Sequence, residues 1–158
     1  MDFPSHFIWA YVLFRHYPWA WPAIAFCLVP DFVWAIPLIV LRFNLWRKKL
    51  PYSEEEDLQS RYLYRTAHSM ITAVLAYFLS GILFGWEMAI GVLAGWTLHL
   101  AMDFWTHKGG IVNGIRLFYP LSDFRLPALI WWREEIRKRP WIYLINLAAA
   151  AIVYYLTI

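Results

Sequence analysis

The chain has 158 residues, a net charge of +3 and a hydrophobic content of 61%, against roughly 45–50% in a typical soluble domain. A water-soluble protein this small cannot bury so much apolar surface, and a disordered chain needs low hydrophobicity. The composition predicts one all-α, polytopic membrane domain over residues 1–158. The charge does not favour nucleic acid as a partner, because membrane proteins carry Lys and Arg in cytoplasmic loops. The single cysteine excludes a disulfide framework and a zinc site built on thiolates.

The first apolar segment, residues 7–29, is interrupted near its middle by Arg-His-Tyr-Pro at 15–18, and Pro30 closes its second arm. Each arm has about 10–12 residues, which is too short to span ~30 Å of hydrocarbon. We therefore expect a short helical hairpin, re-entrant or half-buried. The alternative is one kinked span over 19–43, which would put the carboxylate of Asp31 at its centre at a high energetic cost.

The rest of the chain alternates apolar and polar segments. Further apolar segments that fit helices reaching or crossing a membrane cover residues 32–46, 66–84, 88–106 and 141–158. Gly85–Glu87 predicts a tight turn between two of them. Ser53 and Glu56 form a capping-box pattern, which predicts a helix start. Gly91 and Gly95 are four residues apart, a spacing that permits close contact between helices.

Basic residues gather in two polar segments, 42–65 and 107–140, and are absent from the turn at 85–87. The positive-inside rule then predicts that both large loops are cytoplasmic in a bacterial-type inner (plasma) membrane. The Arg-rich, amphipathic part at 115–140 is expected to form helices along the interface, where membrane lipid is the partner. The oligomeric state is left open.

Ionisable residues in apolar segments are costly and are therefore candidates for function. They are His6, His16, Asp31, His68, His99, Asp103 and His107. His99, Asp103 and His107 are four residues apart and share one helical face. Imidazole and carboxylate groups at this spacing can bind one zinc or other hydrolytic metal ion, which we favour over a polar stripe that only contacts other helices. His107 is a weaker ligand candidate, because a histidine at a helix end also interacts with the helix dipole.

The predicted topology brings more donors to the same level. His68, at the cytoplasmic end of its helix, can face His99 and Asp103, and the hairpin returns His6 and Asp31 to that depth. We expect these five residues to bind one or two divalent metal ions. Two ions a few Å apart would suit the hydrolysis of phosphate esters.

Residues 95–106 read GWTLHLAMDFWT, and they are followed by Gly110, by LFYP at 117–120 and by FRLP at 124–127. These motifs resemble the YdjM-like family of LexA-binding, inner-membrane-associated metal-dependent hydrolases. An early His6, Pro30-Asp31 and His68-Ser69 follow the order of that family. The resemblance covers residues 6–127 and is most specific over 95–127.

The family is in turn similar to helical zinc-dependent phospholipases C, whose metal-binding pattern includes His-x3-Asp. The resemblance implies that His99 and Asp103 are metal ligands, that His68, Asp31 and His6 complete the site, and that the metal is zinc. It also implies a phosphodiester or phospholipid-like substrate.

This chain differs from the family pattern at three positions. Val33, Leu63 and Ala67 stand where the family often has Asp, His and Thr. The loss of the Asp and His donors leaves fewer ligands for a second metal ion. His107 would compensate for this loss.

Three hypotheses follow for the function. The first is a metal-dependent phosphoester hydrolase with Asp31, Arg65 and Arg125 as candidate catalytic residues, one of the arginines steadying the phosphate. The second is an inactive membrane scaffold or regulator that binds a protein partner through its cytoplasmic loops, including the acidic run Glu54–Asp57. The third, a transporter, is disfavoured because about four spans show no internal repeat.

Overall fold

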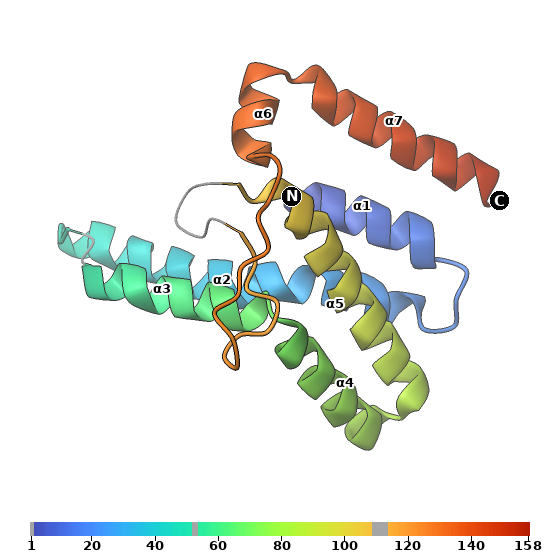
Figure 1. Ribbon diagram of the computed structural model, residues 1–158, viewed down its shortest axis with the longest axis horizontal. Coiled ribbons are helices and arrows are strands. Elements are labelled where there is room, and N and C mark those ends of the chain that lie inside the picture. The colour runs from blue at the N-terminus through green and yellow to red at the C-terminus, as the bar shows by residue number, and fades with distance from the viewer. Residues whose placement is uncertain (1, 52–53, 109–113) are drawn as a thin grey trace.

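The computed structural model describes residues 2–51, 54–108 and 114–158, and the side chains of 54–57 also lie outside this description. The described residues are helical and contain no strand, which confirms the all-α class. The helices are α1 (Phe3–Phe14), α2 (Ala20–Lys48), α3 (Glu54–Ala67), α4 (Met70–Phe84), α5 (Trp86–Thr106), α6 (Trp132–Lys138) and α7 (Trp141–Leu156). In Figure 1, α5 crosses the centre of the molecule, α3 lies along the outer half of α2, and α7 lies beside α1.

The predicted N-terminal hairpin is correct in its first arm and wrong in its second. The chain breaks between α1 and α2 as expected, and α1 has 12 residues. However, α2 does not end at Pro30. It continues through Pro30 and Pro37 for 29 residues, so the alternative with Asp31 inside one long helix fits better. A proline removes one backbone hydrogen bond, and in an apolar helix that loss is tolerated where neighbouring helices pack against it; α2 packs extensively against α5.

Two glycines set the distance between α2 and α5. A Cβ added at Gly91 would lie 2.7 Å from the carbonyl oxygen of Trp19. A Cβ added at Gly95 would lie 2.8 Å from the carbonyl carbon of Ala23 and 2.9 Å from the amide nitrogen of Cys27. The spacing of the two glycines thus permits backbone contact between the helices, as predicted. Because of this contact, His99 on the next turn of α5 lies close to the backbone of α2.

The helix expected over 66–84 is divided in two. Helix α3 ends at Ala67 and α4 begins at Met70, with a bend of 59° between them. Ser69 caps α4, because its hydroxyl accepts a hydrogen bond from the amide of Ile71 (3.1 Å). The same hydroxyl donates to the carbonyl of Tyr119 (2.6 Å). The break leaves His68 between two helices. One nitrogen of its ring contacts the carbonyl of Tyr64, and the other contacts Asp103.

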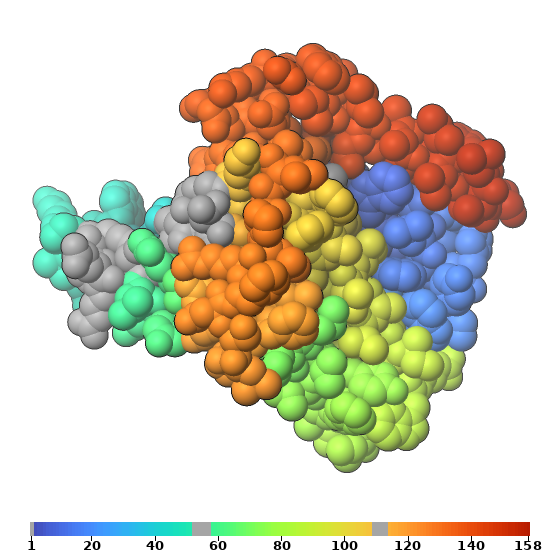
Figure 2. Space-filling model, in the orientation of Figure 1, coloured from blue at the N-terminus to red at the C-terminus, as the bar shows by residue number. Residues whose placement is uncertain are grey.

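The amphipathic stretch at 115–140 is largely not helical, so this part of the prediction is wrong. Only α6, with 7 residues, forms there. The preceding segment, 114–131, contains two prolines that interrupt a helix. It lies over the middle of the molecule, as the orange atoms in Figure 2 show, and its Leu117 carbonyl accepts a hydrogen bond from the amide of Met70 (2.8 Å). The predicted capping residue Ser53 lies outside the described residues.

Two of the described helices, α2 and α5, are long and apolar enough to cross a membrane. The number rises to four if the bent pairs α3–α4 and α6–α7 each count as one span. Alone, α4 and α7 have only 15 and 16 residues. Both present large apolar side chains to the surroundings, such as Ile82, which is 76% exposed, and Leu156, which is 81% exposed. Such a surface fits association with a membrane.

Replacing Gly95 with alanine is expected to destabilise the protein. The new methyl group would collide with the backbone of α2, which cannot rotate aside as a flexible side chain can, and overpacking of this kind costs about 1–3 kcal/mol. Thermal unfolding in detergent, followed by circular dichroism, should show a lower midpoint for G95A. Thr97→Ala, at an exposed position of the same helix, is the control; equal midpoints for the two variants would contradict this account of the contact.

Candidate metal centre

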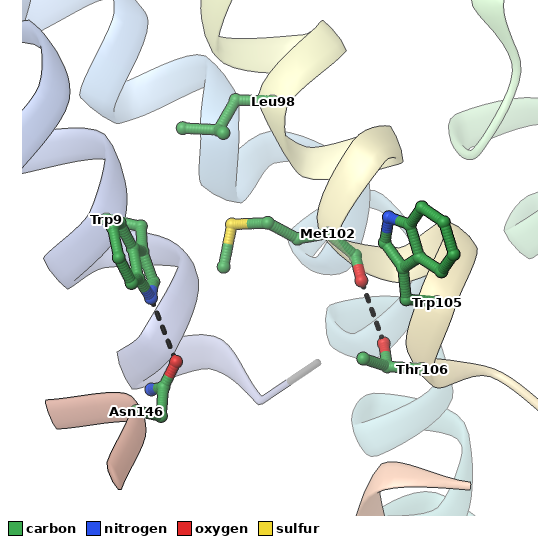
Figure 3. A pocket seen from close by; sticks show the side chains of 6 residues that line it. All are labelled: Trp9, Leu98, Met102, Trp105, Thr106 and Asn146. Atoms are coloured by element: carbon green, nitrogen blue, oxygen red, sulfur yellow. Dashed lines mark hydrogen bonds between the residues drawn. The ribbon is translucent and has the colours of Figure 1, made fainter. Parts of the chain in front are cut away.

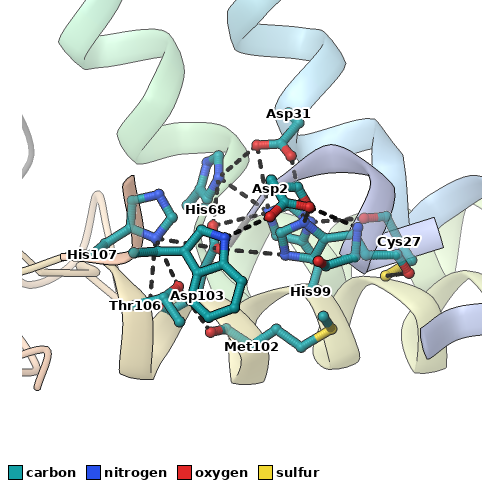
Figure 4. Close-up of polar contacts among 12 residues, drawn as sticks. Asp2, Cys27, Asp31, His68, His99, Met102, Asp103, Thr106 and His107 are labelled. Carbon is teal, nitrogen blue, oxygen red and sulfur yellow. Dashed lines mark hydrogen bonds and ion pairs between the residues drawn. The ribbon is translucent and has the colours of Figure 1, made fainter. Parts of the chain in front are cut away.

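All six predicted metal-binding residues come together, and Figure 4 labels all of them except His6. They are His6 from α1, Asp31 from α2, His68 from the break between α3 and α4, His99 and Asp103 from α5, and His107 at the end of α5. Four of these side chains are at most 1% exposed, whereas those of Asp31 and His107 are 21% and 18% exposed. The group is therefore buried, with two members at its open edge.

Four of the six residues form the tightest group. Asp31, His68, His99 and Asp103 each offer one ligand atom, and these atoms all lie within 4.8 Å of one another. The Nε2 atoms of His68 and His99 are 3.1 Å apart, and each lies 3.3 Å from Oδ2 of Asp103. Oδ1 of Asp31 lies 3.6 Å and 3.9 Å from the same two nitrogens. We call these four residues the metal group.

The other ring nitrogen of each histidine fixes what Nε2 can do. Nδ1 of His68 lies 3.0 Å from the carbonyl oxygen of Tyr64, and Nδ1 of His99 lies 2.7 Å from that of Cys27. A carbonyl can only accept, so we assign the proton of each neutral ring to Nδ1. Each Nε2 is then a lone-pair donor, and two such lone pairs face each other beside two carboxylates. A bound cation or an added proton relieves this repulsion, and a backbone carbonyl on the far ring nitrogen is typical of metal-binding histidines.

The remaining two histidines hold the other oxygen of Asp103. Nε2 of His6 lies 3.2 Å from Oδ1 of Asp103, and Nδ1 of His107 lies 3.3 Å from it. The ring of His6 stacks on that of His99, with centroids 4.2 Å apart. Burial lowers the pKa of His107 to about 4, so this ring is neutral near pH 7. His6 and His107 thus orient the carboxylate that the metal group shares.

Two supporting residues were not predicted. The ring of Tyr64 stacks on His68, with centroids 3.8 Å apart. Asp2 caps α1 through the amide of Ser5 (2.9 Å), and its carbonyl lies 3.0 Å from Nδ1 of His6. A sequence signal exists for both: Tyr64 is one helical turn before His68, and Asp2 occupies a capping position ahead of a proline.

Arg65 and Arg125 are the two arginines expected to steady a phosphate. Partial burial and the positive charges of Arg65 and Arg125 lower the pKa of Arg116. Arg116 forms an ion pair with Asp123. In the part of the chain that the structure describes, neither Arg65 nor Arg125 forms an ion pair with Asp31. Their predicted role therefore has no support from a contact at the metal group.

Two cavities adjoin the site. The first, of about 340 Å³, is called here the indole pocket, and its lining includes Asp2, Trp34, His107, Trp131, Trp132 and Arg133. The second, of about 350 Å³, is called the apolar cavity, and it is lined by Trp9, Leu98, Met102, Trp105, Thr106 and Asn146 (Figure 3). Thr106 borders both cavities, so the indole pocket, which carries charged side chains, and the apolar cavity lie next to each other at the end of α5.

Comparisons of the chain with protein-family models, with curated proteins and with solved structures find no match. The resemblance to the YdjM-like family therefore stays a prediction from the sequence motifs. The chemistry of the site is interpreted from its geometry.

His99→Ala is expected to abolish metal binding, because it removes one of the two facing Nε2 donors. The chain, purified in detergent without chelator and reconstituted with zinc, should hold near-stoichiometric metal by mass spectrometry, and H99A should hold only background. His16→Ala removes a histidine at an exposed position outside the group and should leave the metal content unchanged. Equal metal in H99A and H16A would contradict the site.

Metal should also stabilise the fold, since ligand binding to the native state alone raises its stability. The expected gain is about 2.7 kcal/mol at a free metal concentration 100 times Kd. Thermal unfolding of the chelated protein should therefore shift to a higher midpoint when zinc is added, and the shift should be absent in His68→Ala. A midpoint indifferent to zinc and chelator would speak against a metal in this buried group.

Proposed function

We propose that the chain is a membrane-embedded, metal-dependent hydrolase of phosphoester or phospholipid-like substrates, acting at the cytoplasmic face of the inner membrane, and that it is a YdjM-like protein. The observation that carries the proposal is the metal group itself. Two imidazole nitrogens and two carboxylates converge within 4.8 Å in a buried setting, and the histidines are oriented by backbone carbonyls. Such a group binds a divalent ion more readily than it serves as a packing contact.

The donor set suits zinc, although other divalent metals accept the same nitrogen and oxygen ligands. Asp31, His68, His99 and Asp103 would hold the ion. When bound, zinc lowers the pKa of a water molecule and polarises a phosphoryl oxygen. Positions 33 and 63 carry Val and Leu, which are 41% and 37% exposed. The chain thus has no donors at these positions, which favours one ion over two.

The side chains at the open edge of the metal group have the exposure that proton transfer needs. The Asp31 carboxylate is 21% exposed and can accept a proton from an attacking water. The His107 ring, which is neutral near pH 7, is 18% exposed and borders the indole pocket, where it can accept a proton. His6 contacts the carboxylate of Asp103 from the buried side.

Two features support a lipid-like substrate. The metal-binding His99 and Asp103 belong to α5, a helix long and apolar enough to cross a membrane. The apolar cavity meets the indole pocket at Thr106, so a headgroup and the start of a hydrocarbon chain would find suitable surroundings side by side. In this proposal the chain is multi-pass and its large loops are cytoplasmic.

The alternative is an inactive membrane scaffold or regulatory protein that binds a partner through its cytoplasmic loops. The apolar residues Val33 and Leu63 favour it, because the family often has metal donors there. The acidic run Glu54–Asp57, its expected contact patch, has side chains outside the described residues. The intact metal group favours the hydrolase.

The hydrolase predicts metal-dependent cleavage of a phosphodiester by the purified chain. Zinc-loaded protein in mixed micelles should hydrolyse bis(p-nitrophenyl) phosphate or phosphatidylglycerol, and chelation should stop the reaction. Asp103→Asn should lower the rate by at least about 100-fold, since it removes the charge on which four histidines converge. Asp123→Asn changes a carboxylate that is 80% exposed and serves as the control. Cleavage that survives in D103N would refute the assignment, and metal binding without any cleavage would favour the scaffold.

A further inference from the structure

The indole pocket opens at the edge of the metal group. Its lining includes His107, which contacts Asp103 of that group at 3.3 Å. It also includes Trp34, which is one helical turn after Asp31 on α2. Asp31 and His107 are the two members of the cluster with appreciable exposure. Of the two cavities, the indole pocket is therefore the one whose lining includes a member of the cluster.

The walls of the pocket are tied to the site by hydrogen bonds. The segment before α6 pairs with the end of α5 through two hydrogen bonds. The amide of Lys108 donates to the carbonyl of Ile130 (2.8 Å), and the amide of Ile130 donates to the carbonyl of Trp105 (3.1 Å). The Trp132 indole N–H donates to the Asp2 carboxylate (2.5 Å). Its position is thereby linked to the N-cap of α1, next to His6. The pocket is a built cavity with fixed aromatic walls.

Two side chains of opposite charge, Asp2 and Arg133, line the pocket. The two oxygens of Asp2 already accept hydrogen bonds, one from the amide of Ser5 and one from the Trp132 indole. Arg133 lines the same pocket, and within the described part of the chain it forms no ion pair. A guanidinium group binds phosphate oxygens with two parallel hydrogen bonds. The oxygens of Asp2 are thus engaged by N–H groups of the protein, whereas the guanidinium group of Arg133 and the aromatic walls remain to bind an incoming group.

We infer that the indole pocket is the substrate-binding pocket of the proposed hydrolase, and that Arg133 holds the anionic phosphate of a phosphoester whose neighbouring part packs against Trp34 and Trp131. The inference rests on the proposed function for its chemistry. A volume of about 340 Å³ is at the lower end for small-molecule sites, which fits a headgroup-sized anion. The phosphoester is either a phospholipid headgroup or a water-soluble ester, and the test separates the two.

The experiment compares three variants with the intact zinc-loaded chain in detergent. Arg133→Gln removes the charge, Arg133→Lys keeps it without the bidentate geometry, and Arg137→Gln removes an exposed charge of the same helix outside the pocket lining. The probe is inorganic phosphate, whose binding is measured by isothermal titration calorimetry, and bound zinc is measured alongside. R133Q should weaken phosphate binding about tenfold, as expected for the loss of a charged hydrogen-bond partner, R133K should weaken it less, and R137Q and the zinc content should stay unchanged.

Two substrates then distinguish the sources of the phosphate. If R133Q raises KM for phosphatidylglycerol in mixed micelles and leaves that for bis(p-nitrophenyl) phosphate unchanged, the pocket holds a lipid headgroup; if it raises both, it holds phosphoesters in general. Phosphate affinity that is the same in R133Q as in the intact chain, or that falls equally in R137Q, overturns the inference. Weaker phosphate binding in R133Q alone, from a chain without hydrolytic activity, would uphold the pocket and refute the proposed hydrolase.

Discussion

A carboxylate with no exposed surface at position 103 is the constraint around which the rest of the structure is arranged. A buried charge without partners is too costly to keep. Four histidines surround Asp103: His6 and His107 face one oxygen, and His68 and His99 face the other. Because the Nδ1 protons of His68 and His99 point to backbone carbonyls, a cation or a proton bound at their Nε2 atoms offsets the charge of the carboxylate. The four rings come from three separate parts of the chain, so the carboxylate can be accommodated only when α1, the α3–α4 break and α5 have all assembled.

The contact between α2 and α5 makes that assembly possible. Gly95 lets the backbones touch at Ala23 and Cys27, and one turn further His99 reaches the carbonyl of Cys27. The same helix pair brings Asp31 to the edge of the group. The break at Ser69 positions His68. It ends α3 before this residue, and the backbone carbonyl of Tyr64 contacts Nδ1 of the His68 ring. The glycine contact and the Ser69 cap thus position the side chains of the metal group.

Much of the candidate site could be predicted from the sequence, because the spacing of His99 and Asp103 alone puts both on one helical face. The glycine contact was readable in the same way, from Gly91 and Gly95. The continuation of α2 through Pro30 could not be predicted in this way. The sequence shows that the proline removes a backbone hydrogen bond, but it does not show the packing against α5 that compensates for this loss. The break at Ser69 was missed because the apolar helix was expected to begin at Thr66, three residues before the capping residue.

Other features have no sequence signal of their own. The acceptors for His68 and His99 are backbone carbonyls, which every residue carries, so only the fold reveals which of them are used. The loop over 114–131 is held by contacts with distant residues such as Met70. An amphipathic pattern there predicts an interfacial helix, but prolines within it prevent one from forming. Tertiary contacts, more than local propensity, decide both cases.

X-ray absorption at the zinc edge of the purified, reconstituted chain tests the central claim most directly, because it identifies the ligand atoms. The account predicts nitrogen and oxygen ligands at about 2.0–2.2 Å, with the multiple-scattering pattern of two imidazole rings and no sulfur. His68→Ala should lose one imidazole. A spectrum with sulfur ligands, with no imidazole, or unchanged in that variant would contradict a metal centre built from Asp31, His68, His99 and Asp103.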